Sequence, residues 1–337
     1  MILVDRYKEF KDMLLKSSNR PYSPFQIFRL YIDFLFNRAV RGVYLIDYIQ
    51  YKFYDRNALS RETFIEYQKL HMIMDKANNI EKRELFDKKS LFNKTFDEYL
   101  NRNWLDVKES TYEEFSKFLK ENKKIIVKPS GGFFGIGINI LNSYEILSGN
   151  TKKYFDDFIK QDALIESVLV QYSDLEKFND TSVNTLRMTT FIDKNKKPNL
   201  MSAVIRIGRK GKVTDNFHNQ GVAAKVDVET GVVCTVAIDK DFNNYINHPD
   251  SNMQIVGYKF KNWDKIVKYS LNLAMVVPDV RYVGWDISID ENGNPVCIEG
   301  NYGADPDAPQ TTDQIGKYFD FVEKLWCKNL HKTLDWV

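Results

Sequence analysis

The amino-acid sequence contains little glycine, little cysteine and no long apolar run. Its 16 glycines among 337 residues fall below the roughly 7% share of an average soluble protein. The three cysteines, Cys234, Cys297 and Cys327, are far apart and odd in number. This excludes a disulfide framework and a zinc knuckle, and it predicts a reduced, cytoplasmic protein. No apolar run reaches the roughly 18 residues of a membrane-spanning helix.

Charge and composition exclude further classes of protein. The formal net charge of +2 is far from the strongly basic character of a dedicated nucleic-acid binder, so no nucleic-acid partner is expected. The 43% hydrophobic and 14% aromatic content can fill a sizeable core, which excludes wholesale disorder. Charges interrupt the first residues, MILVDRYKEFKDM, so no signal peptide is expected.

The scarce glycines gather in one place. Residues 1–130 contain only Gly42, whereas residues 131–137 contain four glycines. Short apolar runs at 124–128 and 138–141 flank the cluster, which predicts two strands joined by a glycine-rich loop. An ordinary hairpin turn needs fewer glycines. The pattern therefore favours a loop whose backbone N–H groups cover phosphate oxygens.

This loop differs from two common nucleotide motifs. Gly132 and Gly137 have the spacing of a P-loop, but Ile138 stands where that motif requires a lysine. No helical pattern opens after Gly137, so the Rossmann fingerprint is excluded as well. Lys128, just before the loop, is placed to add a positive charge beside a phosphate.

Hydrophobic periodicity predicts an α+β chain with a helical N-terminal part. Up to residue 121 the chain reads as helical, with helices expected at 24–36, 60–78, 81–102 and 111–121. Later helices are expected at 151–161, 263–277 and 313–331. Strands of a mostly antiparallel sheet are expected at 124–128, 138–141, 163–171, 185–192, 202–207, 221–228, 232–238, 285–289 and 296–299.

A predicted hairpin near the C-terminus carries a candidate metal site. The turn sequence 291–294 joins two strands that place Asp286 opposite Glu299. Opposed carboxylates in a half-buried sheet repel each other, and a divalent cation would relieve this, with Asn301 as a third oxygen ligand. Such a set is typical of magnesium. The alternative is a solvated pair at a sheet edge, which the apolar neighbours make less favourable.

Two strands carry arginines in apolar surroundings. Asn184 and Arg187 are the polar positions of an alternating run, and Arg187 could hold a carboxylate or phosphate by two hydrogen bonds. Arg206 lies in an apolar strand, where an unpaired charge is costly. Its partner is expected to be either a carboxylate of the protein or a phosphate of a ligand.

Together these segments resemble the ATP-grasp superfamily, and within it the sugar-transfer-associated group of bacterial surface-polysaccharide loci. The resemblance runs from about Gly42 to about Gln310. It rests on five ordered pieces: Asp87-Lys88, VKPSGGFFGIG at 127–137, LIESVLVQ at 164–171, SVNTLRMTT at 182–190 and WDISID…VCIEGNYGADPDAPQ at 285–310. It implies two α+β subdomains with mostly antiparallel sheets that grip ATP. We place the helical N-terminal region at 1–84 and the subdomains at 85–170 and 171–337.

The resemblance implies roles for the matching residues. For ATP these are Lys128, either Lys88 or Lys89, the flap residues Ser130, Gly131, Gly132, Gly135 and Gly137, and a hinge that reads adenine through the backbone of Glu166, Ser167, Val168 and Leu169. Arg206 would contact the transferred phosphoryl group. Asp286, Glu299 and Asn301 would hold one or two Mg²⁺ ions. On the acceptor side we expect Arg187, Asn184, His218 and Asn219, although His218 reads equally well as a loop histidine without a role.

The implied activity is that of an ATP-dependent carboxylate–amine ligase working through an acyl phosphate. The expected substrates are an amino acid or amine and a sugar acid or amino sugar, in capsule or lipopolysaccharide biosynthesis. One alternative is a small-molecule kinase on the same scaffold. Another is a non-catalytic nucleotide-binding partner of a glycosyltransferase.

The aromatic segment 25–54 leaves one further choice open. Its phenylalanines and tyrosines are interleaved with arginines, so it could lie on a membrane surface. An amphipathic helix pair packed on the body of the protein is the favoured interpretation. A homodimer is compatible with the sequence.

Overall fold

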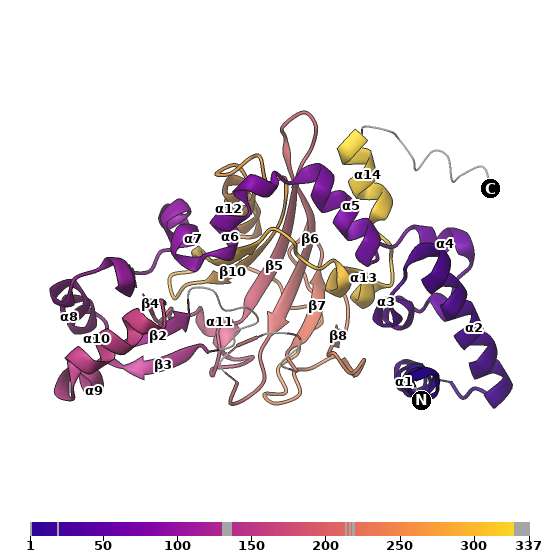
Figure 1. The fold of residues 1–337 in the computed structure, drawn as a ribbon, viewed down its shortest axis with the longest axis horizontal. Coiled ribbons are helices and arrows are strands. Elements are labelled where there is room, and N and C mark those ends of the chain that lie inside the picture. The colour runs from indigo at the N-terminus through magenta and orange to yellow at the C-terminus, as the bar shows by residue number, and fades with distance from the viewer. Residues whose placement is uncertain are drawn as a thin grey trace.

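The computed structural model describes residues 2–18, 20–129, 137–212, 214, 215, 217 and 220–326. Two antiparallel sheets, one with four strands and one with seven, form the framework. Figure 1 shows the smaller sheet at one end of the molecule, the larger sheet in the middle and the first four helices at the other end. The predicted α+β class, with a helical N-terminal region before two sheet-containing units, is confirmed.

The N-terminal region consists of short and medium helices. They are α1 (Ile2–Ser17), α2 (Pro24–Arg41), α3 (Leu45–Gln50), α4 (Ala58–Glu62) and α5 (Tyr67–Ala77). The helix predicted over 60–78 is therefore broken. The side chain of Gln310 hydrogen-bonds both the N–H and the C=O of Ile65, at 2.9 and 3.0 Å, and occupies backbone groups that a continuous helix would pair internally.

The single helix predicted over 81–102 is wrong. The segment folds into the short helices α6 (Glu84–Asp87) and α7 (Lys89–Thr95), separated by Lys88 in an extended conformation. Phe86 and Phe96 contact Trp285 of the larger sheet. Packing against this tryptophan, rather than helical propensity, decides the course of the segment.

The smaller sheet has the strand order β1-β4-β2-β3. Its strands are β1 (Trp104–Asp106), β2 (Lys124–Pro129), β3 (Asn139–Asn142) and β4 (Ala163–Ser167). The predicted β2–β3 hairpin is confirmed, whereas β1 was not expected. Helices α8 (Tyr112–Glu121), α9 (Ser143–Ser148) and α10 (Thr151–Lys160) share a core with this sheet. A capping box between Thr111 and Glu114 starts α8.

The larger sheet has the strand order β11-β10-β5-β6-β7-β8-β9. Its strands are β5 (Thr185–Ile192), β6 (Pro198–Ile207), β7 (Val222–Val226), β8 (Ala237–Ile238), β9 (Asn244–Tyr245), β10 (Tyr282–Ile289) and β11 (Pro295–Asn301). The helices of this part are α11 (Ser173–Glu176), α12 (Trp263–Ala274), α13 (Asp307–Asp313) and α14 (Tyr318–Trp326). The strand predicted over 232–238 is shorter than expected, because only its last two residues pair as a strand.

Helix α2 has apolar residues on two faces. Ile27, Tyr31 and Phe34 are buried in a cluster with α1 and α3, so this face packs mainly within the N-terminal helices, whereas the sequence predicted packing on the body of the protein. The opposite face exposes Phe25 and Phe36. In the described part of the chain, no helix combines the length and the apolar character needed to cross a membrane.

Candidate active site

The β10–β11 hairpin brings two carboxylates together at one edge of the larger sheet. Asp290 closes its turn, because Oδ1 accepts the N–H groups of Asn292 and Asn294 at 3.0 and 2.7 Å. The turn sets the pairing up to Ile287 and Cys297, and a register shift between Asp286 and Ile287 then places Asp286 opposite Glu299. The pairing predicted from the turn sequence is confirmed.

Two arginines from neighbouring strands hold Asp286. Arg187 lies opposite it in the sheet and donates from Nε to Oδ1 at 2.5 Å and from Nη2 to Oδ2 at 3.0 Å. Arg206 of β6 donates from Nη1 to the two carboxylate oxygens at 3.0 and 2.9 Å. Burial favours the neutral acid, but the two guanidinium charges outweigh it and lower the pKa of Asp286 to about 2. Asp286 is therefore an ionised, buried carboxylate.

Arg206 has a second carboxylate partner in Asp215. Its Nη2 donates to Oδ1 of Asp215 at 2.9 Å, and the hydroxyl of Thr185 donates to Oδ2 of the same carboxylate. The choice that the sequence left open is thus resolved in favour of protein carboxylates. Nε of Arg206 is buried and has no hydrogen-bond partner in the part of the chain that is described. A buried donor without a partner is costly, so a further acceptor is expected at this N–H group.

Glu299 and Asn301 are the other two oxygen ligands expected beside Asp286. The Glu299 side chain is exposed to solvent. Desolvation by the nearby protein atoms and repulsion by Asp286 raise the pKa of its carboxyl. Asn301 follows two residues later in the same strand, and its Oδ1 accepts the N–H of Gly303 at 2.9 Å. No group of three His, Cys, Asp or Glu side chains is gathered for a metal among the described residues. The set of two carboxylates and one amide oxygen nevertheless fits Mg²⁺, whose charge would offset the repulsion between Asp286 and Glu299.

A buried ion cluster lies between the two sheets. The carboxylate of Glu166, on β4, accepts from Nζ of Lys128 at 2.6 Å, from Nε of Arg102 at 2.8 Å and from Nδ2 of Asn93 at 3.0 Å. Burial would raise the pKa of Glu166, but the charges of Arg102 and Lys128 lower it. Glu166 thus fixes the position of Lys128, the expected phosphate-binding lysine.

Arg102 extends this cluster to the larger sheet. Only 3% of its side chain is exposed. Its Nη1 donates to the C=O of Cys297 at 2.5 Å and its Nη2 donates to the C=O of Ile298 at 3.1 Å. These carbonyls directly precede Glu299. One guanidinium therefore joins the strand that orients Lys128 to the strand that carries Glu299.

The structure distinguishes the two adjacent lysines near residue 88. Lys88 is exposed and forms an ion pair with Glu84. Lys89 is half-buried, and burial lowers its pKa, while Glu299, Lys128 and Glu166 act on its charge. The choice between Lys88 and Lys89, which the sequence left open, is therefore narrowed to Lys89, because its charge interacts with those of this cluster.

Part of the expected nucleotide loop lies outside the described residues. This applies to Ser130, Gly131, Gly132 and Gly135. Gly137 is described and has a φ of 80°, and a Cβ there would come within 2.9 Å of the Pro129 ring. Both features require glycine at this position.

The expected adenine hinge follows β4. The expectation that Glu166 belongs to this hinge is corrected. Glu166 lies in an inner strand opposite Trp104 and Ile126, and its side chain belongs to the ion cluster. Ser167 hydrogen-bonds the backbone of Asn103. Val168 and Leu169 leave the sheet and are half-buried, so a role in adenine binding stays a prediction for 167–169.

Asn184 does not lie on an acceptor surface. It is 0% exposed. Its Nδ2 donates to the C=O groups of Leu175 and Asn179 at 2.9 and 3.0 Å, and its Oδ1 accepts the N–H of Gly208 at 3.2 Å. The expected acceptor role is corrected, because these bonds keep the side chain inside the protein. His218 and Asn219 lie outside the described residues.

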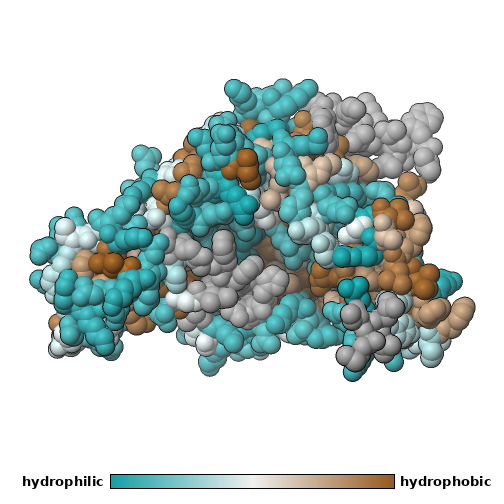
Figure 2. Space-filling view, in the orientation of Figure 1, coloured by the Kyte–Doolittle hydropathy of each residue, from teal (hydrophilic) through white to brown (hydrophobic). Residues whose placement is uncertain are grey.

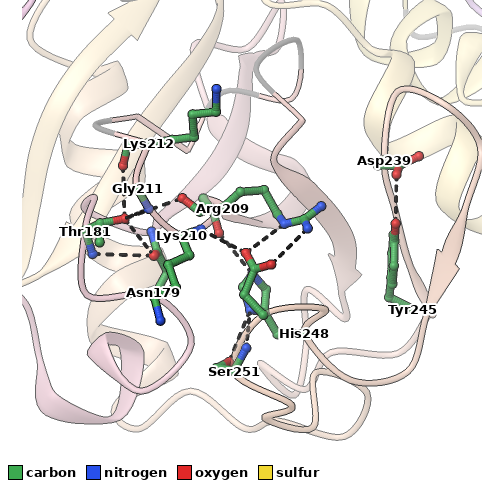
Figure 3. A network of polar contacts seen from close by, with 12 residues as sticks. Asn179, Thr181, Arg209, Lys210, Gly211, Lys212, Asp239, Tyr245, His248 and Ser251 are labelled. Carbon is green, nitrogen blue, oxygen red and sulfur yellow. Dashed lines mark hydrogen bonds and ion pairs between the residues drawn. The ribbon is translucent and has the colours of Figure 1, made fainter.

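A polar network holds the segment that follows β6 (Figure 3). The hydroxyl of Thr181 accepts the N–H of Gly211 at 3.0 Å, and Arg209 forms two bonds to Asp250 at 2.8 and 2.9 Å. Nε2 of His248 lies 3.0 Å from the C=O of Gly208. Because a carbonyl can only accept, this nitrogen carries the proton. The network anchors the start of the segment that leads to Asp215, the partner of Arg206.

A family sequence model that matches most of the chain shows to which family the protein belongs. The sequence model of the family described as "Sugar-transfer associated ATP-grasp" matches residues 68–316. The chain belongs to this ATP-grasp family. The family resemblance stated from the five motifs is therefore confirmed. No curated protein matches the chain.

Several solved ATP-grasp structures are similar at low identity. The ATP-grasp ligase PsnB, complexed with a phosphomimetic variant of its minimal precursor, Mg and ADP, is 13% identical with a TM-score of 0.43, over 74% of this chain and 62% of that chain. D-alanine–D-alanine ligase from Bacillus anthracis is 14% identical with a TM-score of 0.43, over 73% and 69%. PurK, an N5-carboxyaminoimidazole ribonucleotide synthetase in an ADP complex, is 9% identical with a TM-score of 0.46, over 71% and 51%. The chain thus spans less than two thirds of the PsnB and PurK chains.

Sequence reasoning missed Arg102, Asn93 and Asp215 as parts of this ATP-grasp site. Arg102 and Asn93 lie in a segment that reads as an uninterrupted charged helix, so no motif singles them out. Asp215 could have been found, because the buried Arg206 required an anionic partner.

Proposed function

We propose that this protein is an ATP- and Mg²⁺-dependent carboxylate–amine ligase. The observation that carries the proposal is the convergence of Lys128, Arg187 and Arg206 with the carboxylates of Asp286 and Glu299 where the two sheets meet. Phosphoryl transfer depends mainly on positioning and charge neutralisation. Cations and paired carboxylates in this arrangement are suited to both tasks.

Each side chain would have a distinct task. Lys128 and Lys89 would bind the phosphates of ATP, and the buried Nε of Arg206 would donate to the transferred phosphoryl group. Asp286, Glu299 and Asn301 would hold Mg²⁺, which supplies electrostatic stabilisation of the phosphates when it is bound. Backbone groups of 167–169 would contact adenine, and the loop residues Ser130, Gly131, Gly132, Gly135 and Gly137 would cover the phosphates.

The proposed reaction has two steps. A carboxylate oxygen of one substrate attacks the γ-phosphorus of ATP, the bond to the β,γ-bridging oxygen breaks, and ADP leaves. An amine then attacks the carbonyl carbon of the acyl phosphate, loses a proton and expels inorganic phosphate, which leaves an amide. Arg187 would orient the substrate carboxylate, since it lies at the edge of the Asp286 site.

The proposal also covers the two substrates and the biosynthetic pathway in which they are joined. One substrate would be an amino acid or amine, and the other a sugar acid or amino sugar, during capsule or lipopolysaccharide biosynthesis in the cytoplasm. The sugar-transfer association in the family description supports this choice. We further propose the division into a helical region at 1–84 and subdomains at 85–170 and 171–337.

The test measures ADP and inorganic phosphate released by the full chain with amino acids and with uronic or amino sugars, singly and in pairs. We expect release that requires both a carboxylate and an amine, and Asp286→Asn should abolish it. Asp174→Asn is the matched control, because Asp174 also pairs with two cations but lies on α11 and contacts Lys177 and Lys261. It should retain activity.

Two results would contradict the ligase proposal. ATP consumption with an alcohol alone, giving a stable phosphorylated product that hydroxylamine does not trap, would identify a kinase. Absence of turnover with every pair, together with full function of Asp286→Asn in cells, would identify a non-catalytic nucleotide-binding partner.

A further inference from the structure

Helix α2 presents a continuous apolar face to solvent. Five side chains form this face, here called the α2 stripe, and their exposed fractions are 75% for Phe25, 53% for Phe28, 49% for Ile32, 62% for Phe36 and 63% for Val40. Successive members are three or four residues apart, so they share one side of the helix. Figure 2 shows hydrophobic side chains along the molecular edge where α2 lies.

The size of the α2 stripe is that of an interaction surface. Taking about 200 Å² for an aromatic side chain, the three phenylalanines alone expose roughly 400 Å². With the two aliphatic residues, the stripe reaches roughly 500 Å² on one copy. Exposed apolar patches of this size on a monomer are often functional. Two stripes buried against each other would remove about 1,000 Å², which is the lower bound for a specific interface.

We infer that the α2 stripe is the contact through which two copies of this chain form a two-fold symmetric dimer, with their α2 helices antiparallel. The spacing of the stripe is self-complementary about Ile32, as such symmetry requires. Phe28 and Phe36 lie four residues before and after Ile32, so Phe28 of one copy meets Phe36 of the other. Phe25 and Val40 meet in the same way at the two ends of the interface. Antiparallel helices also place their dipoles in a favourable arrangement.

Charges beside the α2 stripe fit the same pairing. Arg29 and Asp33 lie on one flank of the stripe, three residues before and one residue after Ile32. In the antiparallel pair, Arg29 of each copy is then within reach of Asp33 of the other. Asp33 already pairs with Arg61 inside the chain, yet 35% of its side chain is exposed. The symmetric contact therefore has two additional ion pairs, each between Arg29 of one copy and Asp33 of the other.

A membrane surface fits α2 less well than a second copy. Helices that lie on anionic lipid carry several basic residues next to their apolar face. Of the three arginines of α2, Arg41 is paired with Glu62 and Arg38 stacks 4.4 Å from the ring centroid of Tyr44. Arg29 stands next to the acidic Asp33. An acidic side chain thus lies beside the apolar face, which suits a protein partner better than an anionic lipid surface.

The position of α2 keeps this dimer compatible with an accessible site. Figure 1 places α2 at the end of the molecule opposite the smaller sheet. Lys128, Glu166, Arg187, Arg206, Asp286 and Glu299 of the candidate active site lie on β2, β4, β5, β6, β10 and β11, respectively. Dimerisation through α2 therefore does not depend on the proposed ligase activity, and its test uses no substrate.

The test is the mass of the full chain measured by analytical ultracentrifugation across a micromolar concentration series. We expect a dimer for the natural chain and a dissociation constant raised at least about tenfold in Phe28→Glu/Phe36→Glu, because the antiparallel pair brings four carboxylates together. Ile80→Glu is the matched control, since Ile80 is 68% exposed and lies outside α2, and it should remain dimeric. Circular dichroism would verify that each variant is folded.

A charge-exchanged variant tests the orientation. In Phe28→Lys/Phe36→Glu, antiparallel pairing sets each new lysine against a new glutamate of the other copy, so the dimer should persist. Parallel pairing would instead place lysine next to lysine and glutamate next to glutamate. Dissociation of this variant would therefore overturn the antiparallel arrangement. A monomeric natural chain, or equal dimerisation of Phe28→Glu/Phe36→Glu and Ile80→Glu, would overturn the contact itself. So would a monomer that binds phosphatidylglycerol vesicles through the same phenylalanines.

Discussion

Arg102 offers the most informative single substitution, because it joins the two sheets by side-chain bonds alone. Arg102→Met keeps most of the side-chain volume and removes the guanidinium. Five hydrogen bonds are lost, two to Glu166 and three to backbone carbonyls of Leu100, Cys297 and Ile298. Glu166 then keeps Lys128 and Asn93 as partners.

The expected cost follows from burial. The side chains of Arg102 and Glu166 are 3% and 2% exposed, so water cannot replace the lost partner. Removing one member of such a buried pair costs about 3–5 kcal/mol. Without Arg102, the ammonium of Lys128 is the main positive charge next to the Glu166 carboxylate, so it is held more tightly against that carboxylate. We therefore also expect weaker ATP binding.

The assay is urea unfolding followed by circular dichroism, with ATP binding measured by calorimetry. Arg209→Met is the matched control, because Arg209 also makes two bonds to one carboxylate but is 26% exposed. A partly exposed ion pair contributes about 1 kcal/mol or less. Arg102→Met should therefore lower the unfolding midpoint several times more than Arg209→Met, and only the former should weaken ATP binding.

A small effect would refute this reasoning. If both variants unfold at the same midpoint, the buried cluster does not stabilise the contact between the sheets. If Arg102→Met unfolds early but binds ATP like the natural chain, Glu166 does not control the position of Lys128. The double variant Arg102→Met/Glu166→Gln should be more stable than the sum of the single effects predicts, because it removes both buried charges.

Three further predictions concern a lysine of the site, a buried carboxyl of the N-terminal helical region and the buried Asn184. Lys89→Met should raise the Kd for ATP by about tenfold or more, whereas Lys88→Met, which removes only an exposed ion pair, should leave it unchanged in calorimetry. Burial raises the pKa of Asp47 to about 7 from about 4 in an unfolded chain. Between about pH 4 and pH 7 the folded state therefore keeps a proton on Asp47 that the unfolded state releases, so the free energy of unfolding falls as pH rises across this window. Asp47→Asn should make the urea midpoint less dependent on pH in the same window. Asn184→Ala should destabilise the chain by about 2 kcal/mol or more without changing the KM for either substrate. A specific rise in one KM would restore the acceptor role of Asn184.

Local patterns along the chain predict much of this fold. Helix α8, the hairpin around the 291–294 turn and the strands β5 and β10 depend on neighbouring residues, and all were expected. The hairpin brings Asp286 and Glu299 to the same place, but their direct opposition also needs the register shift between Asp286 and Ile287, which the sequence does not announce.

Contacts between distant segments could not be read in the same way. The helix expected over 81–102 is broken because phenylalanines of this segment pack on Trp285, about 200 residues away. The choice between Lys88 and Lys89 depends on which of two adjacent side chains turns toward Glu299. No sequence spacing resolves that difference.

The sequence by itself determined the family, and it predicted the candidate oxygen ligands on β10 and β11 and the cations expected to bind phosphate. These depend on residue type and short-range order, which a linear chain displays. Only the tertiary structure decided that Glu166 and Asn184 turn inward, that Arg102 ties the two sheets together, and that α2 keeps one apolar face exposed. The physical reason is that burial and ion pairing belong to the packed state, in which residues far apart in sequence share one desolvated space.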